Sequence, residues 1–409
     1  MSSCIVYIGD FDFRNENVQA HLVKNNGKIL TALGYHVEYI GINRKESSFE
    51  AISKLPLLQL ENGNCYYELP ETLNIKGLFK TLEVCQAIIN KLDELQKQYD
   101  ISHIITYQSP TYSIAIKKIT KWCQEHKVHY IVNCADLPTF ELQSPLRKIV
   151  MKANWNYLHK VNKKYADGVI AVSKFIAEFY DKPGRASVVI PPLFDVVENI
   201  THVKPNDTAT FIYAGTPFKI TGREASPDGM KDRLDKVIDY FLLLSEQGKK
   251  YTLNIVGINK NDYLNGVPRH ATALGNESNI VFWGKHSHED TLRMVSESDF
   301  SINYRDENLM TKAGFSTKIV ESVSLGTPVI INEISDTFDY LMDGISGFVM
   351  STDVESLKML SSLCEMKVDD RIEIKKKCLK TKTFHWQNYE DCFAKFLENV
   401  QKQMIDDMD

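Results

Sequence analysis

Long apolar runs are missing from this 409-residue chain. No stretch of about 18 residues is apolar enough to cross a membrane. The apolar run near the start, within MSSCIVYIGDFDF, is too short and too early for a signal peptide, so we expect a cytosolic protein. The eight cysteines form no CxxC pair, which favours reduced, packed thiols over disulfides or a zinc site.

The chain also lacks an excess of positive charge. The 48 Lys and Arg residues are outnumbered by 53 Asp and Glu residues, which gives a net charge of -5 at pH 7. No basic stripe is interleaved with aromatic residues, so the sequence argues against nucleic-acid binding. No GxGxxG motif follows the first predicted strand, residues 4–9, which argues against a dinucleotide-binding oxidoreductase.

Strands and helices alternate along most of the chain. Residues 4–9, 18–33 and 36–41 have the patterns of a strand, a helix and a strand. This order predicts a right-handed crossover unit of a parallel sheet. The alternation starts again at Thr210, which predicts a second doubly wound sheet.

The length of the chain suits two α/β domains of about 200 residues each. Pro191 and Pro192 cannot continue a central strand, and a polar run follows them. We therefore expect one domain at residues 1–195, a linker at 196–206 and a second domain at 207–385.

Residues 314–331, GFSTKIVESVSLGTPVII, carry the clearest chemical signal. Gly314 permits a close backbone approach, and Ser316 or Thr317 can cap a helix whose first amides suit a phosphate. Glu321 lies one turn further along the same face, where a carboxylate beside a diphosphate is favourable only if it binds hydroxyl donors such as a ribose diol. The stretch predicts nucleotide binding; the alternative is an ordinary strand-helix-strand unit with a surface glutamate.

The same stretch, with Arg305 before it and residues 338–350 after it, resembles the donor half of retaining glycosyltransferases of family 4. The resemblance implies the GT-B fold, in which two doubly wound Rossmann-like domains face a central cleft and a last helix, here within 386–409, packs on the first domain. The first domain would bind the acceptor and the second the nucleotide sugar. The implied donor-binding residues are Gly215, Lys231, Gly314, Phe315, Ser316, Thr317, Lys318 and Glu321.

Two positions depart from the family pattern. The family has two glutamates separated by seven residues, but Ala313 stands where the first is expected. An arginine usually follows the preceding glycine, but Thr216 stands there, and Arg223 in the long loop is only a weak substitute.

Two cations are candidates for the donor diphosphate. Lys231 stands at the start of a predicted helix, where a positive charge is unfavourable unless an anion is bound. Arg305 is a catalytic candidate because a guanidinium is well shaped to neutralise the leaving diphosphate. A salt bridge from Arg305 to Asp306 or Glu307 is the alternative.

Polar residues follow the predicted strands of the first domain. The loop 9–17 lies at the carboxyl end of a strand, where ligands of open α/β sheets bind. The residues that we assign to acceptor binding are Asn15, Asn17 and Gln108. The resemblance implies that Asp136 contacts the reacting sugar, although it is equally suited to capping a loop. Asp10 and Asp12 favour turn capping or acceptor contacts over a metal site, and no metal or cofactor is expected.

Residues 146–165 are expected to form a basic helix without an acid from 147 to 164. At 100° per residue, one face carries apolar side chains and another carries basic ones: Leu146, Val150, Ala153, Tyr157 and Val161 against Lys148, Lys152, His159 and Lys163. Such a helix can lie against anionic lipid or simply present a solvated charged face. Both interpretations remain open, so peripheral contact with the inner face of the cell membrane is an expectation.

Together these features predict a metal-independent glycosyltransferase that moves a sugar from a nucleotide-diphosphate sugar to a saccharide or lipid-linked acceptor hydroxyl. The resemblance implies retention at the anomeric carbon and a role in surface polysaccharide biosynthesis. The alternatives are a catalytically silent nucleotide-sugar-binding subunit of the same fold and a nucleotide-sugar epimerase.

Overall fold

The protein is described here by a computed structural model. The structure describes residues 3–14, 18–43, 57–60, 63–70, 77–107, 113–137, 145–195, 206–226 and 229–406. The chain forms two compact units: Met1–Leu193 together with Trp386–Asp409 (unit 1), and Phe194–His385 (unit 2). Most of the expected linker, 196–205, lies outside the described residues.

Unit 1 is built on an eight-stranded sheet with the order β3-β4-β2-β1-β5-β6-β7-β8, parallel except for the pairing of β3 with β4. The strands are β1 (Ser3–Gly9), β2 (His36–Asn43), β3 (Leu57–Gln59), β4 (Cys65–Pro70), β5 (Asp100–Tyr107), β6 (His129–Cys134), β7 (Gly168–Ala171) and β8 (Ala186–Val189). β6 and β7 are buried along their whole length, as expected for apolar parallel strands covered on both faces.

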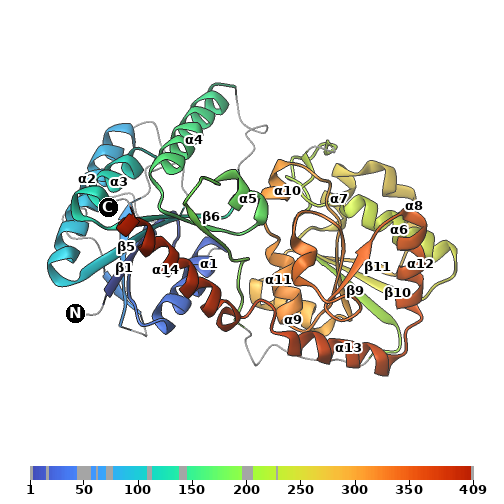
Figure 1. Ribbon diagram of the computed structural model, residues 1–409. Helices are drawn as coiled ribbons and strands as arrows, with labels where there is room; N and C mark the ends of the chain where they lie inside the picture. Colours follow the sequence, from blue (N-terminus) through green and yellow to red (C-terminus); the bar gives the residue numbers. More distant parts are fainter. Residues whose placement is uncertain are drawn as a thin grey trace. The chain divides into compact units, whose positions relative to one another are not determined.

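The first helices of unit 1 lie between its strands in the sequence, whereas its last two helices follow unit 2 in the chain (Figure 1). They are α1 (Val18–Ala32), α2 (Gly77–Gln98), α3 (Ser113–His126), α4 (Pro145–Tyr165), α5 (Lys174–Phe179) and, after the short helix η7 (Trp386–Tyr389), α14 (Glu390–Asp406). α14 packs against the edge strand β8, and η7 packs against α1. Gly168 in β7 permits this packing, because a Cβ there would lie only 2.7 Å from a methyl carbon of Val400.

Unit 2 is built on a six-stranded parallel sheet with the order β11-β10-β9-β12-β13-β14. Its strands are β9 (Ala209–Ala214), β10 (Tyr251–Val256), β11 (Ile280–Gly284), β12 (Phe300–Asn303), β13 (Val329–Asn332) and β14 (Gly347–Met350). Its helices are α6 (Leu234–Glu246), α7 (Lys260–Gly266), α8 (Ala271–Asn276), α9 (His288–Glu297), α10 (Leu309–Ala313), α11 (Thr317–Ser324), α12 (Asp353–Cys364) and α13 (Val368–Thr381).

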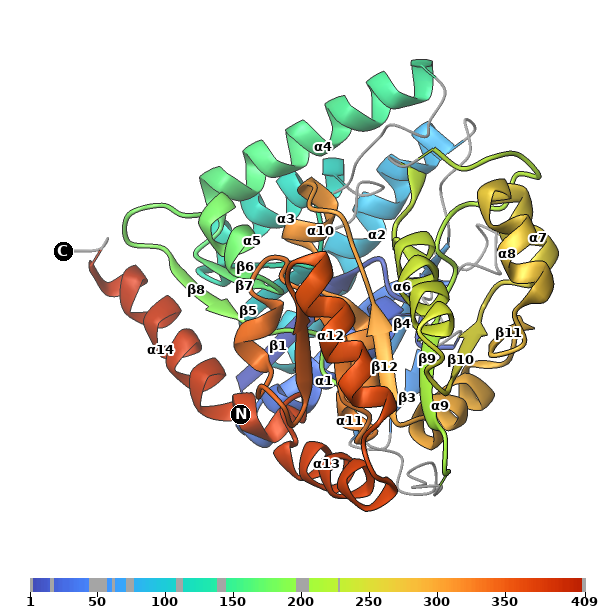
Figure 2. The same cartoon turned by 90° about the vertical axis from the view of Figure 1, so that its right-hand side faces the viewer.

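The helices of unit 2 cover its sheet in two layers (Figure 2). α6 packs with α12 in one layer, while α9, α11 and α13 pack together in the other. A large apolar core that includes Phe211, Phe241 and Phe300 lies under α6, and a smaller one around Val295 lies under α9. The prediction of two Rossmann-like α/β domains is confirmed.

α4 exposes part of its predicted apolar face. Its buried residues are Trp155, Leu158, Val161 and Asn162, whereas Val150 and Tyr157, which we assigned to the apolar face, are 61% and 37% exposed. The predicted apolar face is therefore exposed at Val150 and Tyr157 and buried at Val161. In the part of the chain that the structure describes, no helix has both the length and the apolar character needed to span a bilayer.

Candidate functional site

The stretch that carries the chemical signal, residues 314–331, runs from the end of α10 through α11 into β13. Ser316 takes the N-cap position of α11, but its hydroxyl makes no capping hydrogen bond, contrary to our expectation. The side chain is 4% exposed, and its oxygen has no partner among the described residues. The first amides of a helix lack acceptors within that helix. Thr317 and Lys318 therefore begin a helix end that offers donors to a ligand.

Phe315 lies in the same loop, but its side chain belongs to the core. It is 9% exposed and packs edge-to-face against Tyr340 and Phe384, with ring centroids 5.5 and 5.8 Å away. This aromatic packing anchors the loop between Gly314 and α11. Only the backbone of Phe315 is then suited to contact a donor.

Glu321 lies one turn into α11, as predicted. Burial raises the pKa of its carboxyl to about 7, although the charge of Lys318 opposes the shift. Within the described residues its carboxylate has no hydrogen-bond partner. A half-buried acid without a partner is costly unless a ligand supplies hydroxyl or amide donors.

Two of the candidate cations converge on Asp232, a residue that the sequence did not single out. The Asp232 side chain is fully buried. Lys318 donates to its carboxylate, and Arg305 Nε donates to Oδ1 at 2.7 Å. The hydroxyl of Tyr213 donates to Oδ2 at 2.8 Å. Burial alone would raise the pKa of Asp232, but Lys318 and Arg305 hold it at about 2. Asp232 is therefore an anion that fixes both cations.

From the sequence we considered a salt bridge from Arg305 to Asp306 or Glu307, and this partner was wrong. Arg305 pairs with Asp232, whereas Asp306 binds Arg233 and Lys236, the latter at 2.9 Å. The terminal guanidinium nitrogens of Arg305 make no hydrogen bond within the described part of the chain. The N–H groups of these nitrogens are therefore available to bind another group.

Gly215 and Lys231 lie beside the same cluster. Gly215 has φ +150°, and a Cβ there would overlap the side chain of Lys318, so glycine allows the lysine to cross the end of β9. The Lys318 pKa is lowered mainly by burial, and the positive charge of Lys231 contributes to that shift. The predicted donor residues Gly215, Lys231 and Lys318 are thus brought together around Asp232, whereas Arg223 is exposed in its loop.

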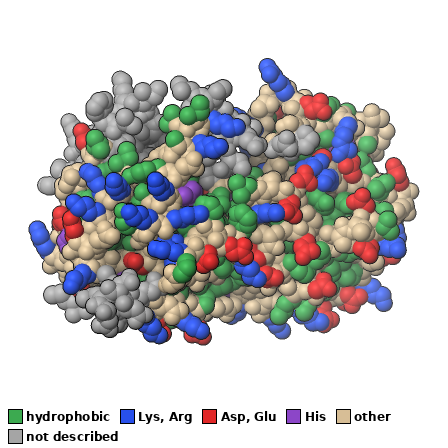
Figure 3. All heavy atoms as spheres, turned by 45° about the horizontal axis from the view of Figure 1, so that its top comes forward, with side chains coloured by type: hydrophobic (Ala, Val, Ile, Leu, Met, Phe, Trp, Pro, Cys, Tyr) green, Lys and Arg blue, Asp and Glu red, His purple; other side chains and the backbone are tan. Residues whose placement is uncertain are grey.

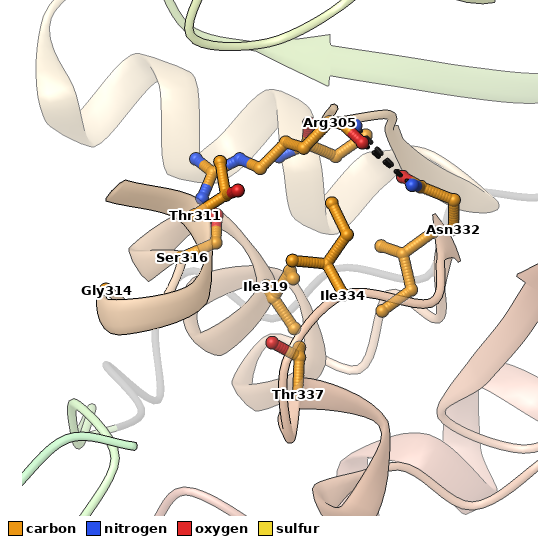
Figure 4. A pocket seen from close by; sticks show the side chains of 10 residues that line it. Arg305, Thr311, Gly314, Ser316, Ile319, Asn332, Ile334 and Thr337 are labelled. Atoms are coloured by element: carbon orange, nitrogen blue, oxygen red, sulfur yellow. Dashed lines mark hydrogen bonds between the residues drawn. The ribbon is translucent and has the colours of Figure 1, made fainter. Parts of the chain in front are cut away.

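A small pocket opens beside this cluster (Figure 4). Its space is about 20 Å³, roughly enough for one water molecule. Arg305 and Asn332 lie at its rim. The backbone amide of Arg305 donates to Oδ1 of Asn332 at 2.9 Å, and Nδ2 of Asn332 donates to the carbonyl of Arg305 at 2.8 Å. These two hydrogen bonds join the ends of β12 and β13. Asn303 and Ser316 line it with side chains that are buried and without partners among the described residues. The pocket therefore presents several unused polar atoms next to the start of α11.

The comparisons with known proteins bear on this region. Residues 230–370 match the family model of glycosyl transferases group 1. The matched segment lies within unit 2 and contains Lys231, Asp232, Arg305, Lys318 and Glu321. The search of curated proteins by sequence found no match.

Solved glycosyltransferases of the GT-B fold resemble the whole chain. HepE of Anabaena, solved in complex with UDP, has a TM-score of 0.62 and 15% identity, with 97% of this chain and 100% of that chain covered. Sucrose-phosphate synthase of Thermosynechococcus elongatus has a TM-score of 0.58 and 13% identity, with 98% of this chain and 99% of that chain covered. The lipopolysaccharide outer core galactosyltransferase WaaB has a TM-score of 0.59 and 13% identity, with 96% of this chain and 99% of that chain covered. At these identities the likeness shows the shared fold.

The acceptor candidates lie in unit 1, outside the segment that matches glycosyl transferases group 1. Tyr107 ends β5, and Asp10 and Asp136 follow β1 and β6. Burial raises the pKa of Tyr107 well above its ordinary value, and the charges of Asp136 and Asp10 add to the shift, so the three lie near one another. Asp136 itself is exposed. Asn15, Asn17 and Gln108 lie outside the described residues.

Asp10 and Asp12 follow β1 in the first loop. Asp12 is fully buried, and its Oδ1 accepts a hydrogen bond from the amide of Arg14 at 3.0 Å, which is the turn-capping role that we favoured. Among the described residues, no group of three or more His, Cys, Asp or Glu side chains is arranged to hold a metal ion.

Proposed function

We propose that the protein transfers a sugar from a nucleotide-diphosphate sugar to a hydroxyl of a saccharide or lipid-linked acceptor. The observation that carries the proposal is the unpartnered carboxylate of Glu321, one turn behind a helix start that is flanked by Lys231, Lys318 and Arg305. Cations and amides bind a diphosphate, and the acid binds the adjoining ribose. The match to glycosyl transferases group 1 and the UDP in the HepE structure support a nucleotide-sugar donor.

Sugar transfer requires stabilisation of the diphosphate as the anomeric carbon–oxygen bond breaks. In the proposed reaction the acceptor oxygen forms the new bond with retention, and its proton passes to a donor phosphate oxygen. Lys231, Lys318, Arg305 and the amides from Gly314 to Thr317 offset the charge on the leaving group, which makes a metal unnecessary. Asp136 contacts the reacting sugar, while Asn15, Asn17 and Gln108 bind the acceptor.

Transfer by the purified protein is the direct test. The protein is incubated with a panel of nucleotide sugars, with and without oligosaccharide or lipid-linked acceptors, and the products are analysed. Wild-type protein should release the nucleoside diphosphate and form a glycoside, whereas Glu321→Ala should weaken donor binding about 10- to 150-fold, the value of one hydrogen bond to a charged group. Donor affinity that is unchanged in Glu321→Ala contradicts the assignment.

A catalytically silent binding subunit is the second candidate. The position of the family's first glutamate is held by Ala313, which is fully buried, and Thr216 replaces the usual arginine. Such a subunit would bind a nucleotide sugar with the same dependence on Glu321 and turn nothing over. Binding without product, across the full panel of acceptors, would favour this candidate over transfer.

We also propose peripheral contact with the cytoplasmic face of a membrane, as suits an enzyme of surface polysaccharide biosynthesis. Ile149 and Val150 of α4 are 67% and 61% exposed between the exposed Lys148 and Lys152. Figure 3 shows basic and apolar side chains side by side on this face of unit 1. Exposed apolar residues flanked by lysines favour anionic lipid over plain solvent. Cosedimentation with vesicles containing phosphatidylglycerol, which Ile149→Ser/Val150→Ser should reduce, tests the proposal.

A further inference from the structure

A second cavity, of about 430 Å³, lies in unit 1 where three strands begin. Val128 precedes β6, Asp167 precedes β7 and Arg185 precedes β8, and all three residues line the cavity. These strands are parallel, so their amino ends share one edge of the sheet. Asp136 follows the carboxyl end of β6, at the opposite edge. The cavity is therefore separate from the candidate acceptor residues.

The charged residues among those that line this cavity are mostly basic. Lys164, Lys182 and Arg185 line it against a single carboxylate, Asp167, which accepts a hydrogen bond from the amide of Tyr130 at 2.7 Å. The neighbouring Lys163 has a pKa lowered by burial and by the charge of Arg185. Positive charge is thus concentrated around the cavity, which favours an anionic occupant.

Arg185 and Lys182 are held in place by local structure. Arg185 donates to the carbonyls of Ala166, Tyr180 and Lys163 at 2.8, 2.8 and 2.6 Å. These bonds use three of the five N–H donors of a guanidinium, so two remain. The Arg185 amide also donates to the carbonyl of Lys182 at 3.0 Å, closing a turn whose third residue, Gly184, has φ +82°.

The helix-capping role of Arg185 does not account for the two lysines. Its three bonds satisfy carbonyls near the ends of α4 and α5. Lys164 and Lys182 are both exposed, and neither forms a salt bridge with a described residue. Their ammonium groups are point charges on flexible stems that can converge on one anion.

We propose that this cavity binds a small phosphate-bearing molecule, with Lys164, Lys182 and Arg185 contacting the phosphate. The volume lies within the range of roughly 300 to 1,000 Å³ that is typical of small-molecule sites, which leaves space for an organic group beside the phosphate. The position at the far edge of the sheet makes this molecule an effector or a stabilising ligand and not the sugar donor.

Calorimetric titration of the full-length protein with inorganic phosphate and with glucose 6-phosphate tests the proposal, at constant ionic strength with sodium chloride as reference. The double substitution Lys164→Ala/Lys182→Ala should weaken binding about 10-fold or more, because each lost contact is a charge-assisted hydrogen bond. Lys152→Ala removes an exposed lysine of α4 that does not line the cavity and should leave the affinity unchanged. Circular dichroism spectra confirm that the variants fold.

The two ligands and a donor-site variant separate the outcomes. Binding of both compounds, or of glucose 6-phosphate alone, with loss in the Lys164/Lys182 variant supports the proposal, and the second pattern shows that the organic group contributes. Absence of binding by both compounds overturns it. Binding that survives Lys164→Ala/Lys182→Ala but is lost in Lys231→Ala also overturns it, because the phosphate then occupies the donor site.

Discussion

Replacement of Asp232 by asparagine tests the electrostatic core of the candidate site. Asp232→Asn keeps the size of the side chain but removes the charge that pairs with Lys318 and Arg305. Removing one partner of a buried ion pair typically costs about 3–5 kcal/mol, because the remaining charge stays buried. The Asp232 pKa, lowered from 3.8 to about 2, independently gives about 2–3 kcal/mol of stability at neutral pH. We expect the free energy of unfolding to fall by about 3 kcal/mol.

The sign of the pH dependence follows from the same shift. The folded-state pKa of Asp232 lies below the unfolded value, so its contribution is complete above about pH 4 and is lost as the pH falls through about 2. The difference in unfolding free energy between wild type and Asp232→Asn should therefore be constant near pH 7 and shrink in acid. Urea denaturation followed by circular dichroism at several pH values measures it.

Asp306→Asn is the matched control for this experiment. Asp306 also accepts from two cations, Arg233 and Lys236, but its side chain is 40% exposed. Pairs at such exposure are typically worth less than about 1 kcal/mol. Equal losses in the two variants, or a loss below about 1 kcal/mol in Asp232→Asn, would refute the view that Asp232 is a buried anion on which the cations depend. The double variant Asp232→Asn/Lys318→Met should recover part of the loss.

Three further predictions concern other residues. The donor affinity of wild-type protein should fall as the pH drops below about 7, because protonation of Glu321 competes with ribose binding. The donor affinity of Glu321→Gln should not change over the same range. Calorimetric titrations from pH 5.5 to 8.5 measure both, and parallel curves would contradict the role of the carboxylate. Gly215→Ala should lower thermal stability and donor affinity, because the added methyl group overlaps the Lys318 side chain. Gly222→Ala, also at positive φ but with no atom nearby, should cost only about 1–2 kcal/mol of backbone strain and leave donor affinity unchanged. Equal donor affinities in the two variants would count against the position of Lys318 across Gly215. Lys375→Met should cost about 2–4 kcal/mol in urea unfolding, because the buried ammonium donates to the carbonyls of Ser296 and Ser298 and to Thr327; a cost below 1 kcal/mol would show that water replaces these bonds.

Most strands of both sheets were predictable from the sequence because each is a short apolar run between polar turns, whereas β3 and β4 were not predicted. Residues 4–9 and 36–41 were assigned as strands, and the structure places β1 and β2 there within one or two residues. α7 and α8 were missed, since these short helices bury few residues, among them Tyr263 and Leu274. A single apolar anchor per helix leaves no periodic signal.

The buried face of α4 was not predictable from the sequence. Counting at 100° per residue divides the helix into faces but does not show which face packs on the rest of unit 1. The structure buries Trp155 and Leu158 together with Asn162, which accepts a hydrogen bond from Tyr130 at 2.8 Å. Packing against a distant strand decides this face, and a local pattern does not contain that information.

The candidate site was predictable where its residues are close in sequence. The loop, Lys318 and Glu321 lie within one strand-helix unit, so helical geometry alone placed them together. Asp232 was missed because its partners Arg305 and Lys318 are 73 and 86 residues away. The correct partner of Arg305 required the tertiary fold, which brings the start of α6 next to the end of β12.

Titration calorimetry with UDP and with 2′,3′-dideoxy-UDP tests most directly whether Glu321 binds the ribose of a nucleotide diphosphate. Wild-type protein should bind UDP about 10- to 150-fold more tightly than the dideoxy compound, and Glu321→Ala should bind both with the lower affinity, because the carboxylate acts only through the two ribose hydroxyls. Equal affinities of the wild-type protein for the two nucleotides, or an equal loss for both in Glu321→Ala, would contradict the account.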